Sequence, residues 1–413
     1  VDLYVRGALG ECVAFMFLPM VLYFAARKKF LSLSLSIAGL ILSHNMLTLI
    51  FLIPIIGYLI YLSFLGKTFR EKILSTKYYL LATIYGFALS AFFWFPAVFE
   101  AKYTLRDIVT KGAIGGFENF SRLIWPSWSY GGSGEFSVQV GLIQWFFMLT
   151  APLIIFIFRK KKQDIWVFLL LLMVLFIVSL FFILPVSKEI YLNTPLLKNF
   201  QFAWRWLSLA IFPPAVFGAA LIYSQKSFAY LLPKKFKMFS ALCLMFCILW
   251  FNKDYWHAYS FVQKPENFYT KEFLGTTDTG EASPIWSVRF MEKEPAAHLE
   301  VIDGKARIKE LIRTSTRHEY EVTVNQESRL RENTLYFPGW EVLVDNEVSG
   351  VEFQDPQNRG LMTFNLSPGN HLVTIVFKET KLRLLADLIS LVSFILLIFL
   401  FLLNWQKKLW KFQ

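Results

Sequence analysis

The chain has 413 residues, of which 55% are hydrophobic, 18% aromatic and 17% charged, and its net charge is +12. Soluble domains have about 45–50% apolar and about 25% charged residues, so this composition excludes an ordinary soluble protein. The basic residues gather at the ends of apolar runs, with only Glu71 and Asp164 in or beside these clusters, at residues 27–29, 67–77, 159–162, 226–237 and 407–411. This is the pattern of the cytoplasmic ends of membrane helices, and it argues against nucleic-acid binding.

The apolar runs predict an α-helical polytopic membrane protein with about nine transmembrane helices. A helix needs about 20 apolar residues to cross a bilayer. If all basic clusters face the cytoplasm, an even number of crossings must separate neighbouring clusters, and the runs satisfy this rule. The first residues would then lie outside and the last inside. The expected spans are residues 8–26, 31–43, 46–65, 78–97, 140–158, 165–184, 206–224, 238–251 and 384–404.

Residues 252–383 have a different pattern, in which apolar and polar residues alternate between turns rich in Gly, Pro, Asp and Asn. Such alternation predicts antiparallel strands, arranged as a β-sandwich-like domain. The expected strands are residues 287–291, 298–302, 320–324, 330–336, 341–344, 361–366 and 371–377. Acidic and basic residues are mixed along them without a visible titratable cluster, so we expect a lid or docking module here.

The sequence therefore predicts three parts. Residues 1–251 form a transmembrane helical domain, residues 252–383 form an extracytoplasmic β-rich domain, and residues 384–413 form the last transmembrane helix with a basic cytoplasmic tail. Because Val1 opens directly into helix-like sequence, we expect the chain to be the later part of a longer protein.

Ionisable residues in the first span are the first functional candidates, because charged groups near a membrane interior are costly. Asp2 and Arg6 are four residues apart and share a helix face. Glu11 lies about 140° round the helix from Arg6 and about one turn deeper. The alternative is a solvated helix end with an ordinary ion pair.

Four further candidates for substrate or phosphate binding lie near the expected outer ends of spans: His44, Glu100, Trp204 and Arg205. His44 stands in the polar break between two apolar helices, where it is either a turn residue or part of a site. Arg205 follows Trp204, and its planar guanidinium suits phosphate, although an interfacial anchor has the same pattern. Glu100 ends a span, either as a substrate contact or as a marker of the interface.

The aromatic residues Trp125, Trp128 and Tyr130 belong to a loop that could stack on sugar rings, or to an aromatic belt at the interface. Several chemistries lack their motifs, including a Walker-type phosphate loop, His-Glu-x-x-His, Cys-x-x-Cys and Gly-x-Ser-x-Gly. The cysteines show no metal-ligand spacing, and no Asp-x-Asp pair exists that would hold a metal–nucleotide-sugar. A sugar donor would therefore be lipid-linked.

Four blocks of the chain together resemble bacterial membrane proteins of the GT-C glycosyltransferase superfamily. They are residues 2–11 (DLYVRGALGE), 42–45 (LSHN), 93–100 (FWFPAVFE) and 201–206 (QFAWRW). The group they resemble is labelled "6-pyruvoyl-tetrahydropterin synthase-related", although nothing in the chain suggests pterin chemistry. Residues 336–345 (YFPGWEVLVD) and 368–371 (PGNH) resemble the C-terminal part of YfhO-type proteins, which are also GT-C-like.

The resemblance implies transfer of a sugar from a polyprenyl-phosphate carrier to a glycan or lipid acceptor of the cell envelope, outside the cytoplasmic membrane. It implies that Arg6 and Arg205 bind the lipid phosphate and that Glu11 and His44 line the site. Asp2 and Glu11 are then the candidate catalytic carboxylates, while the main one is expected upstream of Val1. The resemblance leaves open whether a divalent metal is needed.

A non-enzymatic membrane protein is the competing interpretation. It would transport a lipid-linked glycan or act as an assembly scaffold whose β domain binds partners. This interpretation predicts no essential outer carboxylate, and movement of substrate without covalent change.

Overall fold

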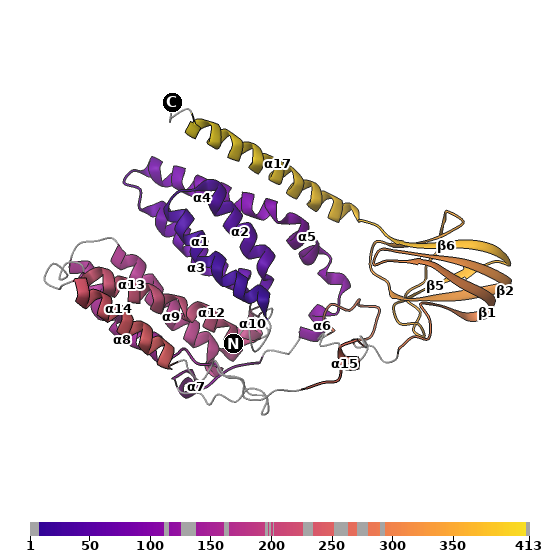
Figure 1. Ribbon diagram of the computed structural model, residues 1–413, viewed down its shortest axis with the longest axis horizontal. Helices are drawn as coiled ribbons and strands as arrows, with labels where there is room; N and C mark the ends of the chain where they lie inside the picture. The colour runs from indigo at the N-terminus through magenta and orange to yellow at the C-terminus, as the bar shows by residue number, and fades with distance from the viewer. Residues whose placement is uncertain are drawn as a thin grey trace. The chain divides into compact units, whose positions relative to one another are not determined.

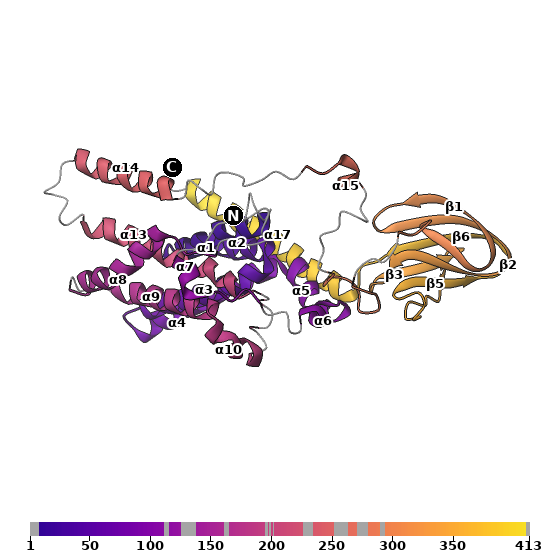
Figure 2. The same ribbon diagram turned by 90° about the horizontal axis from the view of Figure 1, so that it is seen from below.

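The contacts of the chain divide it into two units, one of helices and one that contains a β-sheet. The computed structural model describes residues 8–110, 115–124, 138–160, 165–194, 197, 200, 202–225, 234–251, 263–270, 280–289 and 294–409. Unit 1 comprises Val1–Ser90, Ala113–Gln263 and Leu397–Gln413, and unit 2 comprises Ala91–Gly112 and Lys264–Leu396. The described chain is mostly helical (Figures 1 and 2).

The helices of unit 1 coincide with the apolar runs of the sequence. The longer ones are α1 (Leu9–Ala26), α2 (Phe30–Ser43), α3 (Asn45–Phe64), α4 (Phe69–Leu89), α8 (Leu142–Lys160), α9 (Ile165–Ile183), α13 (Phe212–Gln225) and α14 (Lys234–Phe251). Short helical segments connect them: α7 (Phe120–Ile124), η2 (Pro185–Ser187), α10 (Lys188–Asn193), η3 (Ala203–Trp206) and α12 (Leu207–Ala210). The last helix, α17 (Lys381–Leu409), begins in unit 2 and ends in unit 1.

Among the described residues, six helical stretches are long and apolar enough to cross a membrane. They are α1, α3, α8, α9, Ala203–Leu221 and α17. The pair of α4 and α5 (Ala91–Phe99), bent by 79°, makes a seventh if it is counted as one span; we expected one helix there over residues 78–97. The expected spans 31–43 and 238–251 are helices as well, but α2 has only 14 residues and α14 opens with Lys234 and Lys235.

Close helix packing in unit 1 depends on small residues. The Ser34 hydroxyl of α2 donates to the Ala82 carbonyl oxygen of α4 at 2.9 Å. Gly86 of α4 brings the two backbones together, because a Cβ at this position would lie 2.8 Å from the Ile37 side chain and 2.9 Å from the Ser34 carbonyl oxygen. Tyr79 of α4 donates to the Ala25 carbonyl oxygen at the end of α1. These contacts hold α1, α2 and α4 side by side (Figure 1).

A second group in unit 1 consists of α8, α9, α12 and α13. Its core includes Trp206 of η3, which stacks on Phe182 of α9 with ring centroids 4.5 Å apart. Trp145 of α8 donates its indole N–H to the Leu123 carbonyl oxygen of α7. Contacts of α3 with α9 and α12 join the two groups of helices.

Unit 2 contains one antiparallel sheet of six strands in the order β1-β2-β6-β3-β4, with β5 also paired to β2. The strands are β1 (Leu299–Arg313), β2 (Arg317–Leu335), β3 (Trp340–Val344), β4 (Glu347–Ser349), β5 (Leu361–Leu366) and β6 (Gly369–Phe377). The unit also holds α5, η1 (Ala101–Tyr103), α6 (Arg106–Thr110) and α15 (Glu266–Thr270).

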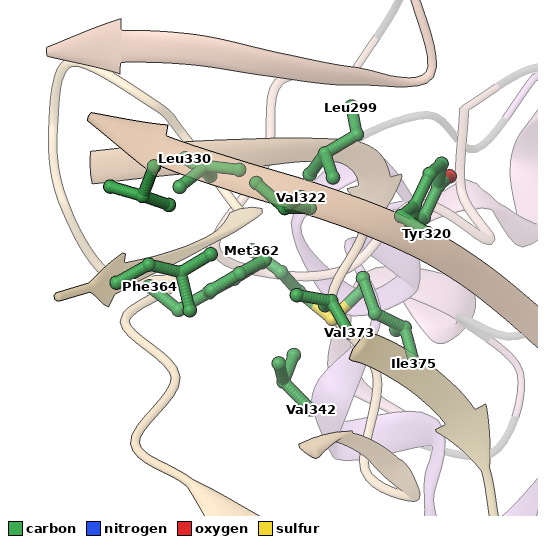
Figure 3. Close-up of a cluster of buried hydrophobic side chains, with 11 residues drawn as sticks. Leu299, Tyr320, Val322, Leu330, Val342, Met362, Phe364, Val373 and Ile375 are labelled. Carbon is green, nitrogen blue, oxygen red and sulfur yellow. The ribbon is translucent and has the colours of Figure 1, made fainter. Parts of the chain in front are cut away.

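Strand β2 organises the sheet because it pairs with three neighbours. It pairs with β1 along most of its length, with β6 through its first half and with β5 through its second half. Alternate residues of these strands point into a shared apolar core that includes Val322, Leu330, Met362, Val373 and Ile375 (Figure 3). The alternation seen in the sequence is therefore the pattern of this core.

The strand predictions were correct in kind and wrong in several bounds. Residues 320–324 and 330–336 were expected as two strands, but β2 is continuous across them. Asp303 and Gly304, which follow the expected strand 298–302 and are of the turn-forming types, lie inside β1, at shifts in the β1–β2 register. Among the described residues 280–289 there is no strand, whereas one was expected from 287. Strand β4 was not expected; it follows a turn whose residues Asp345 and Asn346 both have positive φ.

Candidate functional site

The structure brings together two of the site residues that the sequence predicted, Glu11 and His44. Glu11 lies in the first turn of α1 and is only 4% exposed. His44 separates α2 from α3, and its Nε2 lies 3.6 Å from Oε1 of Glu11. Gly10 permits this approach, since a Cβ there would lie 2.5 Å from the Ser43 carbonyl oxygen. The polar break and the acidic residue therefore form one site in unit 1.

The helix cap defines the role of each ring nitrogen of His44. Its Nδ1 accepts a hydrogen bond of 3.1 Å from the Leu47 backbone N–H and so caps α3. In a neutral ring the proton is then on Nε2, which is the atom that faces Glu11. This arrangement orients an imidazole N–H toward a buried carboxylate. The carboxylate of such a pair can accept a proton from a hydroxyl group.

A second predicted residue, Arg205, lies in η3 among aromatic rings and carbonyl groups of unit 1. Its Nη1 donates to the Phe200 carbonyl oxygen at 3.1 Å. Its guanidinium carbon lies 5.3 Å from the centre of the Phe202 ring and 5.9 Å from that of Trp204. Cation–π contacts of this kind hold a guanidinium in place. The cluster is suited to an anion with oxygen acceptors.

The backbone near Arg205 leaves room for the aromatic rings that surround it. The Trp204 ring stacks on Phe202 at 5.6 Å. Gly116 has φ +70°, and a Cβ on this residue would overlap the indole of Trp204. The Ala203 backbone N–H donates to the Gly115 carbonyl oxygen, which fixes the segment that precedes α7 against η3. Gly116, which is distant in sequence, and Trp204 of η3 thus position the arginine.

Glu100, another predicted residue, forms a polar cluster within unit 2. It is 8% exposed, and both its carboxylate oxygens have partners. Oε1 accepts from the Thr380 hydroxyl at 3.1 Å, and Oε2 accepts from Arg383 Nε at 2.9 Å. Arg383 Nη2 also donates to the Pro338 carbonyl oxygen. The cluster ties the end of α5 to the start of α17 and to the loop before β3, so it supplies a structural role for Glu100. Its predicted substrate contact stays a prediction.

The other predicted site residues lie outside the described parts of the chain. They are Asp2, Arg6, Trp125, Trp128 and Tyr130. Within the described residues, no group of three or more His, Cys, Asp and Glu side chains could hold a metal ion.

Sequence reasoning missed a titratable cluster in the β domain. Glu332 is fully buried, and its carboxylate contacts Arg313 Nη1 at 3.0 Å, His318 Nδ1 at 3.1 Å and the Tyr320 hydroxyl at 3.0 Å. Our expectation that the domain holds no such cluster was wrong. The available signal was alternation, because Leu330 and Glu332 occupy the same inward face of β2.

The Glu332 carboxylate is held in its charged form. Burial alone would raise its pKa, but hydrogen bonds from His318, Thr334 and Arg313 outweigh burial and lower the pKa below its ordinary value. Burial and the adjacent Glu332 carboxylate raise the pKa of Tyr320, which keeps its hydroxyl protonated as the donor. The Glu332 carboxylate therefore has the cationic and hydroxyl partners that a buried charge requires.

Comparison of the chain with protein-family models, with curated proteins and with solved structures finds no match in any of the three.

Proposed function

We propose that the chain is part of a GT-C-type membrane glycosyltransferase, which moves a sugar from a polyprenyl-phosphate donor to a cell-envelope acceptor. The observation that carries this proposal is the buried Glu11 carboxylate facing His44 in a unit of apolar helices. Ionisable groups inside such helices are costly and mark functional sites. The order of the sequence blocks around Glu11, His44, Glu100 and Arg205 connects the site to that superfamily.

The proposal includes insertion in the cytoplasmic membrane. In each of the six candidate spans, only 17–39% of the residues in the apolar stretch are buried inside the protein. Most of their apolar surface therefore faces outward. Contact of this apolar surface with water would be unfavourable, so we place it in contact with lipid. With nine crossings, the lysine-rich helix ends lie in the cytoplasm, and the Glu11–His44 pair, Arg205 and the β domain lie toward the opposite side. On that side the sheet would form a sandwich, in which β2 connects the two layers because it pairs with β1, β5 and β6.

The proposed reaction is a displacement at the anomeric carbon. Glu11 accepts the proton of the acceptor hydroxyl, whose oxygen then bonds to the anomeric carbon. The bond from that carbon to the phosphate oxygen breaks, and polyprenyl phosphate leaves with the electron pair. His44 positions the carboxylate, while Arg205 binds the phosphate whose charge grows as the bond breaks. Arg6 would support Arg205, and Asp2 would be a second carboxylate.

In vitro transfer from labelled polyprenyl-phosphate sugars tests these roles. We expect Glu11→Gln to lower kcat by about 10²–10⁴-fold, which is the usual contribution of a general base. Arg205→Ala should lower kcat/KM for the lipid donor by about 10²–10³-fold. Arg205→Lys should recover only part of that loss, because lysine lacks the planar fork.

Arg27→Gln is the matched control, since Arg27 is an exposed cation at the far end of α1. It should transfer sugar at the wild-type rate. Melting temperatures of all variants identify any loss caused by unfolding. Full activity in both Glu11→Gln and Arg205→Ala would contradict the proposed mechanism.

A non-enzymatic transporter or scaffold is the second candidate, and the pairing of charges in unit 2 favours it. Glu100 is joined to Arg383, and Glu332 to Arg313, within the protein itself. Such networks stabilise the fold of a domain, and the surface of that domain can then bind partners. Movement of a labelled lipid-linked sugar across vesicles without any new covalent product would support this candidate over the enzyme.

A further inference from the structure

A groove of unit 1 lies where α3 ends and α4 begins. It is at the opposite end of α3 from His44. Its volume is about 380 Å³. Its lining combines apolar and basic side chains, among them Phe64, Lys72, Ile73, Thr76, Lys77 and Leu80. No predicted site residue belongs to it.

The groove follows one face of α4. Phe69, Ile73, Thr76 and Leu80 are spaced at three or four residues, so they form a stripe along the helix. The stripe covers 11 residues of sequence separation, or about 16 Å at 1.5 Å per residue. This is long enough for a headgroup at one end and part of an acyl chain at the other.

The basic residues of the groove have no acidic partner among the described residues. Lys72 and Lys77 form no ion pair there, and the nearest carboxylate in sequence, Glu71, is engaged in the capping box of α4. Glu71 Oε2 accepts from the backbone N–H groups of Lys67 at 2.8 Å and of Thr68 at 3.5 Å. The half-buried stem of Lys72 places its Nζ 5.7 Å from the centre of the Phe64 ring. The groove is therefore positively charged.

The apolar residues around these lysines are too exposed for an aqueous surface. Phe64 is 67% exposed, Phe69 78% and Leu80 56%. Aromatic and aliphatic side chains interleaved with lysines at a helix end are typical of the membrane interface, where the stems lie in hydrocarbon and the charges reach the headgroups. A ligand that fits must carry both a negative group and an apolar chain.

We infer that the groove binds an anionic phospholipid of the cytoplasmic leaflet. The lipid phosphate lies against Lys72 and Lys77, and one acyl chain follows Ile73 and Leu80. Basic pockets on the cytoplasmic side of membrane helices bind such headgroups. The inference rests on the proposed membrane insertion and is independent of sugar transfer.

Native mass spectrometry of the full chain in detergent, titrated with phosphatidylglycerol or phosphatidylcholine, tests the inference. The wild type should retain phosphatidylglycerol in preference to phosphatidylcholine. The double variant K72Q/K77Q should bind phosphatidylglycerol about 25-fold more weakly, since each basic residue near an anionic lipid contributes about a factor of five. The variant K72R/K77R keeps both charges and should bind as the wild type does.

The control K28Q/K29Q removes two exposed lysines from the α1–α2 turn, which belongs to another basic cluster and does not line this groove. It should bind phosphatidylglycerol as the wild type does. If K72Q/K77Q lowers the melting temperature, the single variant K77Q replaces it, with an expected loss of about fivefold. Unchanged binding in K72Q/K77Q or in its replacement K77Q, an equal loss in K28Q/K29Q, or equal competition by soluble glycerol 3-phosphate would each overturn the inference.

Discussion

Glu332 shows how much one side chain can determine in the β domain. Its carboxylate is fully buried and joins residues of β1 and β2 through Arg313, His318 and Tyr320. Removal of one partner from a buried ion pair costs about 3–5 kcal/mol, because the other partner is left uncompensated. We therefore predict that Glu332→Ala lowers the free energy of unfolding of the β domain by about this amount.

Hydrogen exchange of the β1 and β2 peptides in the full chain measures this loss. Glu327→Ala is the matched control, because Glu327 is an exposed glutamate of the same strand. It should change the stability by less than about 0.5 kcal/mol. Equal protection of the β1 and β2 peptides in wild type and Glu332→Ala would show that the network adds nothing.

The same residue predicts a dependence on pH. The folded pKa of Glu332 is below the ordinary value of 4.5, so the charged form binds its partners more strongly than the protonated form. Its contribution to stability is fully present above pH 4.5 and is lost as the pH falls through the folded pKa. The exchange difference between wild type and Glu332→Ala should therefore shrink on acidification.

The helices illustrate packing at the scale of elements, and Gly86 is the sharpest case. A Cβ on Gly86 would press against Ile37 and the Ser34 carbonyl oxygen of α2. We predict that Gly86→Ala destabilises unit 1 by about 1–3 kcal/mol, the usual result of overpacking. It should lower the melting temperature of the protein in detergent.

Gly57 of α3 supplies the control, because nothing lies within 4 Å of a Cβ at that position. Gly57→Ala should leave stability unchanged or raise it by about 0.5–1 kcal/mol, since alanine favours a helix over glycine. A melting temperature for Gly86→Ala at or above that of Gly57→Ala would contradict the packing described for α2 and α4.

The elements differ in how well the sequence predicts them. Long apolar runs predicted α1, α3, α8, α9 and α17 because run length alone identifies such helices. The break at Ser90 was missed, since a single serine in an apolar run is an ordinary helix residue. The polar residues 325–329 concealed the continuity of β2, because neighbouring strands and not local preference hold them extended.

At the scale of the molecule, the site depends on contacts that sequence spacing cannot show. Glu11 comes from α1 and His44 from the break between α2 and α3, and their approach follows from how α1 packs beside that break. Because both residues are polar and stand within apolar runs, the sequence was enough to identify them as site candidates. It was not enough to predict that they contact each other. The partner of Glu100 is Arg383, near the other end of the chain, and nothing local to either residue indicates it.

The proposed arrangement in a membrane makes one prediction about the whole chain. Exposed positions of the β domain and of the η2 turn should face one side, and the lysine-rich ends of α1 and α8 the other. Val348 and Val186 represent the first group at 71% and 69% exposed, and Lys28 and Lys160 are exposed members of the second.

Cysteine accessibility in intact cells measures this directly, with Cys12, Cys243 and Cys247 first replaced by serine. Single cysteines at Val348 and Val186 should react with an impermeant reagent added outside. Cysteines at Lys28 and Lys160 should react only after the membrane is opened. Labelling of Val186 and Lys160 from the same side would contradict the proposed topology, and with it the placement of the Glu11–His44 site on the outer face.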